Sequence, residues 1–216
     1  MLCAASIDRA VGEPEASIVA ALDRARDRDE VVQLYGHRPG RLSDLDRVEA
    51  IAAGAQARGL ATLTYAELAA GVPAVAGLAL SFDDADVDLW TAAAARVAPY
   101  GTRLTFFVTR YHLWTEAQRA ALAALAAQGH DVEAHGVNHL RGPEVAEAHG
   151  VAAYLADEVL PSLDRLRADG YAPTVFAYPY GARTPELDRA VLAHVALVRS
   201  VSFTTDNLVV ADPCPE

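Results

Sequence analysis

The sequence has little cysteine and no long apolar segment. Its 216 residues include two cysteines, Cys3 and Cys214, which lack the paired spacing and histidine neighbours of a zinc knuckle. No run is long and apolar enough to cross a bilayer, so we expect no transmembrane segment. The N-terminus also lacks the basic-then-apolar order of a signal peptide. We therefore expect either a cytoplasmic protein or a chain from which such a signal has been removed.

Positive charge and nucleotide-binding motifs are also scarce. Lys and Arg total 18 against 29 Asp and Glu, which gives a net charge of -11. This excess of negative charge repels phosphate backbones and anionic lipids, so we expect no nucleic acid and no membrane surface as a partner. No predicted strand is followed by GxGxxG, and no GxxxxGK[ST] loop occurs, so a nucleotide-binding fold is unsupported. The oligomeric state stays open.

Short β-rich runs alternate with amphipathic helices along the whole chain, whose length fits one domain. The predicted strands are 31–35, 60–64, 77–82, 103–109, 131–135, 174–178 and 195–199. The predicted helices lie near 14–27, 44–58, 87–98, 115–128, 151–169 and 184–193. Such alternation with apolar strands predicts an α/β fold in which helices cover a parallel sheet. Seven strands favour a closed or nearly closed barrel.

A pair of carboxylates, Asp83 and Asp84, directly follows the apolar strand 77–82. Acidic pairs are often solvated turn residues, but parallel barrels place their sites at the carboxyl ends of their strands. Two adjacent carboxylates can also divide the work of a site. One binds a cation, and the other, its pKa lowered by that cation, stays ionised as a base.

Two histidines, His135 and His139, begin where the strand 131–135 ends. Their spacing of four places both imidazoles on one face if the segment forms a helical turn. Histidines at this spacing also occur as surface or capping residues. Two imidazoles and one carboxylate, however, form a three-ligand metal set that leaves positions open for water and substrate. Because strand ends of one parallel barrel meet at one rim, we expect a metal site there.

A third segment, Phe176 to Gly181 (FAYPYG), follows the strand 174–178. Proline and glycine are turn residues, so an ordinary turn is one interpretation. The other is a shaped loop that offers backbone N–H groups and an aromatic wall to a substrate.

These three segments resemble the motifs of the polysaccharide deacetylases, carbohydrate esterase family 4, which read T/S-F-D-D-G, H-[ST]-x-x-H and R-x-P-[YF]-G. The resemblance implies that Asp83 is the catalytic base. It implies that Asp84, His135 and His139 bind a divalent metal, zinc in preference to cobalt or nickel, and that the partner is an acetylated saccharide substrate. It further implies that the Tyr180 main chain contributes to an oxyanion hole and that Tyr178 and Pro179 contact the substrate. Many members of that family are secreted or belong to the cell envelope.

The family's last motif, a strand with Leu and then His as general acid, has no counterpart after residue 181. The segment from Val31 to His37 has that character instead. We therefore predict a single domain, 1–216, that is a circularly permuted, distorted (β/α)7 barrel. Residues 14–70 would correspond to the usual C-terminal segment and 77–203 to the usual N-terminal segment. Residues 1–13 and 204–216 would then meet, which would bring Cys3 and Cys214 within reach of a disulfide.

The chain departs from the family pattern in several places. Ala177 stands where the third motif has arginine, and the fourth motif, which contains an aspartate, is not evident. We expect Arg199, at the end of the last strand, to occupy the vacated space beside the substrate. His37 lies three rather than two residues after Leu34, so Tyr35 and Leu34 are both candidates for the acetyl pocket. Ala85 and Asn138 are further departures.

The predicted function is metal-dependent hydrolysis of acetyl groups on a saccharide, with N-acetyl favoured and His37 as general acid. An O-acetyl esterase or a small-amide hydrolase of the same fold is the first alternative. A catalytically silent carbohydrate-binding module is the second. The aromatic residues that could stack on sugar rings are Tyr178, Tyr180, Trp90, Trp114 and Tyr111, although packing is an equal expectation for the two tryptophans.

Overall fold

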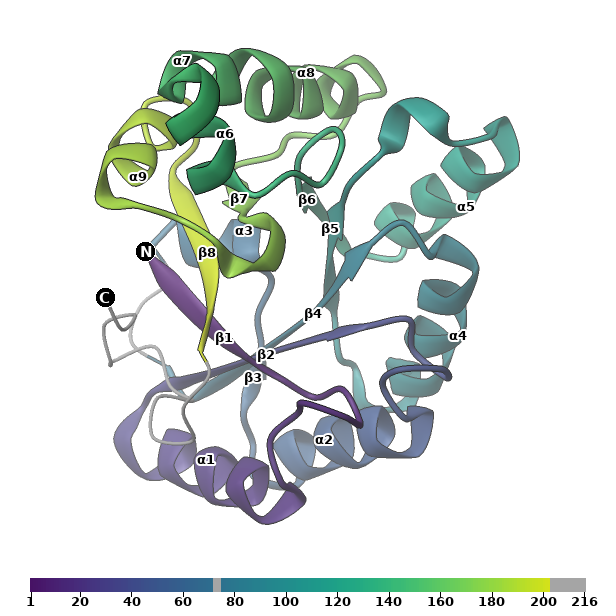
Figure 1. Ribbon diagram of the computed structural model, residues 1–216. Coiled ribbons are helices and arrows are strands. Elements are labelled where there is room, and N and C mark those ends of the chain that lie inside the picture. The colour runs from purple at the N-terminus through teal and green to yellow at the C-terminus, as the bar shows by residue number, and fades with distance from the viewer. Residues whose placement is uncertain (72–74, 203–216) are drawn as a thin grey trace.

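The strands form a closed parallel barrel surrounded by helices (Figure 1). The computed structural model describes residues 1–71 and 75–202. Within them the barrel strands are β1 (Leu2–Ser6), β2 (Val31–His37), β4 (Gly77–Asp84), β5 (Leu104–Val108), β6 (Asp131–Ala134), β7 (Val175–Ala177) and β8 (Leu197–Ser202). Their order around the barrel is β4-β5-β6-β7-β8-β1-β2, and β2 pairs with β4 to close it. This is the predicted fold class.

The helices follow their strands along the chain and ring the barrel, except for α3 (Tyr65–Ala69), which lies behind the strands within the barrel outline in Figure 1. They are α1 (Glu15–Arg28), α2 (Leu45–Ala57), α3, α4 (Val87–Val97), α5 (Glu116–Ala127), α6 (Gly142–His149), α7 (Val151–Tyr154), α8 (Leu160–Ala168) and α9 (Pro185–Val191). Short 3-10 turns are η1 (Ala98–Tyr100), η2 (Tyr111–Leu113) and η4 (Pro179–Gly181), and η3 (Leu155–Val159) is a π-helical turn. No helix among the described residues is both long and apolar enough to span a membrane.

One member of the barrel differs from the prediction. The predicted strand 60–64 shrinks to β3 (Ala61–Thr62), which pairs with β4 alone. Thr64 then caps α3 through a reciprocal capping box with Glu67, which starts a helix where the apolar run suggested more strand. Its place in the barrel is taken by β1, which the sequence pattern missed because its Cys-Ala-Ala stretch has little of the β-branched character that marks strands.

Three of the aromatic residues considered as stacking surfaces lie in the hydrophobic core. Trp90, Trp114 and Tyr111 are buried between the strands and the outer helices. The Trp90 ring stacks on Phe106, with centroids 4.9 Å apart and planes 15° apart. The interpretation of these three side chains as stacking surfaces for sugars is therefore wrong, because Trp90 lies on the apolar side of α4 and Trp114 packs against both Trp90 and Tyr111.

The two ends of the described chain are neighbours in the barrel. β1 pairs in parallel with β8, from Leu2 opposite Arg199 to Ala5 opposite Ser202. A closed ring of consecutive strands has the same order wherever the chain begins, so circular permutation stays a prediction. The predicted contact of 1–13 with 204–216 and the Cys3–Cys214 disulfide both involve positions outside the described residues.

Candidate metal and catalytic centre

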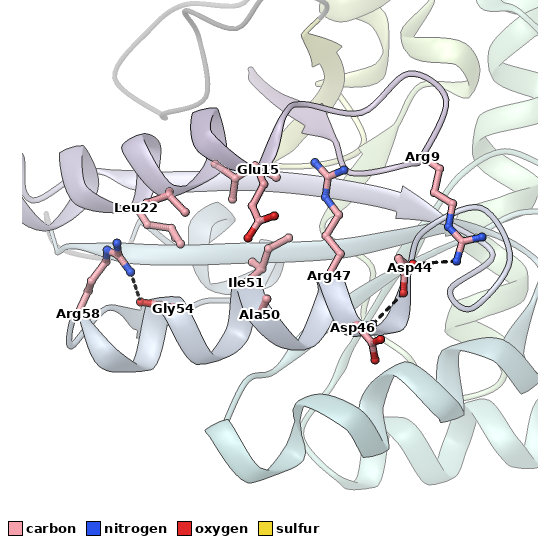
Figure 2. A pocket seen from close by; sticks show the side chains of 12 residues that line it. Arg9, Glu15, Leu22, Asp44, Asp46, Arg47, Ala50, Ile51, Gly54 and Arg58 are labelled. Carbon is pink, nitrogen blue, oxygen red and sulfur yellow. Dashed lines mark hydrogen bonds and ion pairs between the residues drawn. The ribbon is translucent and has the colours of Figure 1, made fainter.

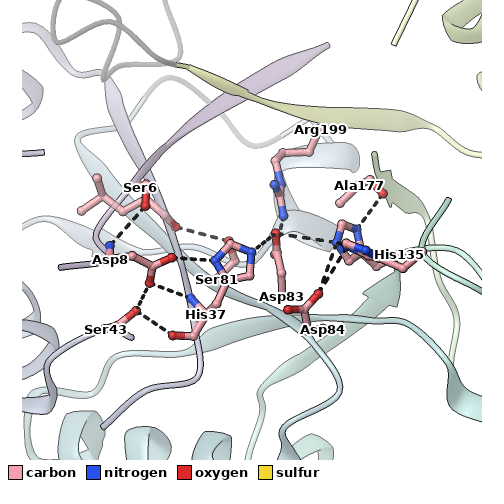
Figure 3. Close-up of polar contacts among 12 residues, drawn as sticks. Ser6, Asp8, His37, Ser43, Ser81, Asp83, Asp84, His135, Ala177 and Arg199 are labelled. Atoms are coloured by element: carbon pink, nitrogen blue, oxygen red, sulfur yellow. Dashed lines mark hydrogen bonds and ion pairs between the residues drawn. The ribbon is translucent and has the colours of Figure 1, made fainter. Parts of the chain in front are cut away.

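The carboxyl ends of the barrel strands bring the predicted site residues together at one rim (Figure 3). Asp83 and Asp84 end β4, and His37 ends β2 directly opposite Asp83 in the parallel register. His135 immediately follows β6. These residues line a cavity of about 420 Å³ together with His139, Tyr35, Tyr178, Tyr180 and Arg199. Segments separated by more than a hundred residues therefore converge on one chemical site.

Asp84, His135 and His139 present three ligand atoms to one point. The Nε2 atoms of the histidines are 3.2 Å apart, and they lie 4.0 Å (His135) and 3.4 Å (His139) from Oδ1 of Asp84. His135 Nδ1 donates to the carbonyl of Ala177 at 2.9 Å, which leaves the Nε2 lone pair directed at the cluster. Burial lowers the pKa of His135 to about 3 and also lowers that of His139, so both imidazoles are neutral. A neutral N/N donor pair with one carboxylate fits a divalent transition metal.

Asp83 is buried beside this cluster and stays ionised. Burial alone would raise its pKa, but Arg199, His135 and His37 together hold the pKa below its ordinary value. Arg199 donates from Nη2 to Oδ1 of Asp83. The other oxygen, Oδ2, faces His37 Nε2 at 3.9 Å and His135 Nε2 at 4.0 Å. One oxygen is therefore anchored while the other is directed toward the site.

Arg199 lies on β8, next to β7, where the third motif of the resembled family would place its arginine. It is the register partner of Ala177, the residue that replaces that arginine. Its fully buried guanidinium lies between the rings of Tyr35 and Phe107, 5.0 and 4.7 Å from their centroids. The position fits replacement of the missing arginine, and the guanidinium pairs with Asp83.

Sequence analysis missed Asp8, which holds His37. His37 Nδ1 donates to Asp8 Oδ2 at 2.6 Å, while Asp8 Oδ1 accepts from the His37 backbone N–H at 2.9 Å and from the Ser43 hydroxyl at 2.5 Å. Burial lowers the pKa of His37, but the bond to Asp8 and the charges of Asp83 and Asp84 raise it to about 9. His37 is therefore protonated at neutral pH. Asp8 follows β1, so recognising that strand would have placed its carboxylate at the rim.

The predicted substrate contacts divide between the cavity and the core. Tyr35, Tyr178 and Tyr180 line the cavity, although the Tyr178 side chain is fully buried and Tyr180 is 53% exposed. Leu34 instead lies in the hydrophobic core between strands and helices, because successive residues of β2 point to opposite faces. Its assignment to the substrate pocket is wrong. Pro179 is buried in η4, beside Gly136.

Backbone strain concentrates at the same rim. Six described residues other than glycine have a positive φ, and five of them follow barrel strands: Arg38, Asp84, Arg110, His139 and Tyr180. Left-handed backbone costs about 1–3 kcal/mol per residue and is retained where function demands it. The loop 135–139 also needs Gly136 (φ 82°), where an added Cβ would lie 2.8 Å from Glu158.

Glu158 fixes the loop that carries the two histidines. Its buried carboxylate accepts bonds from the Asn138 backbone N–H (2.9 and 3.0 Å), the Asn138 side chain (2.8 Å) and the Leu140 N–H (3.3 Å). Glu158 belongs to the π-helical turn η3, just before Pro161. Proline cannot donate the next helical bond, and the wider turn that results directs Glu158 inward. Pro161 can be read from the sequence, but the π-helical turn and the inward direction of Glu158 cannot.

Replacement of Glu158 by Gln is expected to weaken metal binding about 10- to 100-fold, the range typical of residues that orient metal ligands. Glutamine keeps the shape but replaces one acceptor oxygen with a donor that faces N–H groups. The dissociation constant can be measured by competition with a chelator. Asp157→Asn, on the exposed side of the same turn, should leave it unchanged. Equal metal affinities for the wild type and Glu158→Gln would contradict this role of Glu158.

A larger cavity, about 560 Å³, lies between α1 and α2 outside the barrel (Figure 2). Ile18, Leu22 and Ile51 line its apolar floor. Two of its arginines form ion pairs, Arg9 with Asp44 and Arg58 with Asp23. Among the described residues, the group of possible metal ligands lies in the smaller cavity at the strand ends, which is therefore the candidate chemical site.

Comparison with known proteins identifies the family and the fold. The sequence model of the family described as polysaccharide deacetylase matches residues 73–196, more than half of the chain. The chain belongs to the polysaccharide deacetylase family. The match includes the carboxylate pair, both histidines and the Tyr180 loop, while the segment that carries Asp8 and His37 lies before it. A search of curated proteins finds no match.

Solved structures of deacetylases share the fold. The deacetylase PplD of Streptococcus pyogenes, in complex with acetate, is 15% identical, with a TM-score of 0.61 over 79% of this chain and 90% of that one. IcaB from Ammonifex degensii is 18% identical, with a TM-score of 0.65 over 82% and 93%. A polysaccharide deacetylase from Bacillus cereus, BC0361, is 15% identical, with a TM-score of 0.63 over 79% and 57%. At these identities the likeness establishes the barrel.

Proposed function

We propose that this polysaccharide deacetylase is a metal-dependent hydrolase that removes acetyl groups, N-acetyl in preference to O-acetyl, from a saccharide or polysaccharide. The observation that carries the proposal is the convergence of Asp84, His135 and His139 beside the ionised Asp83, with protonated His37 opposite. A base and an acid beside one metal site are what amide hydrolysis needs. A silent binding module would have no use for this arrangement.

Each of the residues around the site would have one role in this reaction. A divalent metal held by Asp84, His135 and His139, for which zinc is our first choice and cobalt or nickel the alternatives, would polarise the acetyl carbonyl and acidify a bound water. Asp83 accepts the water proton through Oδ2, the oxygen that Arg199 leaves available. The N–H of Tyr180 donates to the developing oxyanion. The His37 imidazolium gives its Nε2 proton to the departing amine, while its Nδ1–H continues to donate to Asp8.

Acetate release from a substrate panel tests this function. Metal-stripped protein, reloaded with zinc, cobalt or nickel, should release acetate from N-acetylglucosamine oligomers or peptidoglycan glycans and form one free amine per acetate. Acetylated xylan reports O-acetyl chemistry, and N-acetylated monosaccharides and short amides report small-amide chemistry. Acetate release that needs no metal, or none from any acetylated saccharide with metal present, would contradict the proposal.

A further inference from the structure

The mouth of the site carries an arginine that the proposed chemistry does not use. Arg141 lines the cavity, and its guanidinium carbon lies 4.4 Å from the centroid of the Tyr180 ring. The Tyr180 ring is in turn 4.5 Å from His139. The Arg141 side chain is 46% exposed, and its one neighbouring carboxylate among the described residues, Glu144, is 3.7 Å away and still more exposed. The Tyr180 ring therefore positions the Arg141 guanidinium, whose ion pair with Glu144 is weak.

The charges deeper in the site are already balanced. Asp83 pairs with Arg199, and Asp8 pairs with the His37 imidazolium. A divalent cation on Asp84 would leave the floor with one net positive charge. Arg141 adds another, and the exposed Arg110 after β5 stands at the same rim. With that cation bound, these groups would leave the mouth positive even when Glu144 is counted, although the whole chain carries a net charge of -11.

We propose, on the basis of the proposed deacetylase function, that Arg141 binds a carboxylate on the substrate, so that this enzyme acts on an acidic N-acetylated glycan. The planar guanidinium matches a carboxylate with two parallel N–H···O bonds. Stacking on Tyr180 fixes the plane of this donor pair before the substrate arrives and lowers the entropy lost on binding. The exposed Leu42 on the same cavity offers an apolar surface for the sugar ring. A cationic glycan, rich in free amines, would be repelled.

The test compares oligosaccharides that differ only in this charge. One pair is an N-acetylglucosamine chain with lactyl ethers on alternate sugars and the same chain with the lactyl carboxyls methyl-esterified. The other is an N-acetylglucosamine tetramer oxidised to the carboxylate at C6 and its methyl ester. We expect the zinc-loaded enzyme to favour at least one acid over its ester about tenfold in kcat/KM, which corresponds to about 1.4 kcal/mol. The difference should appear in KM rather than in kcat, because the contact is remote from the acetyl group.

Arg141→Gln should abolish that preference by lowering kcat/KM for the acid about tenfold more than for the ester, and Arg141→Lys should retain part of the preference. Arg28→Gln, an exposed arginine on α1, is the matched control and should keep the full preference. An acid-to-ester ratio near one in the wild type, or a ratio that survives Arg141→Gln, would overturn the inference while leaving deacetylation intact. An equal loss on acid and ester would show a structural role instead. No acetate from any of the four, with acetate released from another saccharide of the panel, would overturn this inference alone, whereas no acetate from any acetylated saccharide would contradict the proposed function.

Discussion

Asp83→Asn is expected to lower kcat by about 10²–10⁴-fold, the contribution typical of a general base. The substitution keeps the shape of the side chain but removes the charge that accepts the water proton. Metal affinity should change little, because the ligand set is Asp84, His135 and His139. Turnover is measured as acetate release, and metal content by titration of the stripped protein. Turnover close to wild type would refute Asp83 as the base.

The same substitution leaves Arg199 as a buried, unpaired cation, which costs about 3–5 kcal/mol. Loss of activity could then reflect loss of fold. The double variant Asp83→Asn with Arg199→Met removes both charges and should recover most of the free energy of unfolding, measured by urea titration. It should remain as inactive as Asp83→Asn. Recovery of activity in the double variant would mean that Asp83 serves stability rather than catalysis.

Asp8→Asn is expected to reduce kcat/KM roughly 10²-fold by disabling the acid. Asp8 Oδ1 accepts from Ser43 and the His37 backbone N–H, so the asparagine side chain would keep its oxygen there and present its amide group to His37 Nδ1. The imidazole would lose the acceptor that keeps it protonated. His37→Gln should give a similar loss. Wild-type activity in either variant would exclude His37 as the acid.

The pH profile separates this role from a structural one. The acid must be protonated, so activity should fall as the pH rises through the pKa of His37, which is about 9. A cation on Asp84 would cancel one of the charges that raise this pKa, so the basic limb of the metal-loaded enzyme should lie below pH 9. In Asp8→Asn the basic limb of the pH profile should lie at a still lower pH. Because the folded pKa exceeds the unfolded one, the stability contributed by His37 is present below about pH 6.5 and is lost as the pH rises through about 9.

Sequence analysis could find the site because strand ends of a parallel barrel share a rim. Asp83, Asp84 and His135 each follow an apolar strand, so local patterns sufficed to place them together. Asp8 and Glu158 could not be found this way. Asp8 follows a strand whose alanines carry little β signal, and Glu158 points inward because of a π turn that periodicity does not reveal.

The fold, like the site, could be predicted only where local sequence patterns determine it. Alternating strands and helices predicted the barrel, but the identity of its seventh strand depended on closure between β8, β1 and β2, a long-range pairing that no local pattern records. Leu34 was misplaced for a related reason. The choice between Leu34 and Tyr35 rests on which face of β2 turns inward, and an almost wholly buried strand lacks the polar alternation that would show it.

The most direct test of the metal centre is a crystal structure of the zinc-loaded protein with anomalous data collected at the zinc edge. We predict one strong peak within about 2.0–2.2 Å of Asp84 Oδ1 and the Nε2 atoms of His135 and His139. Asp83 should lie beside the peak without coordinating it, still bonded to Arg199. No peak at these three atoms, or a peak bound elsewhere, would contradict the account.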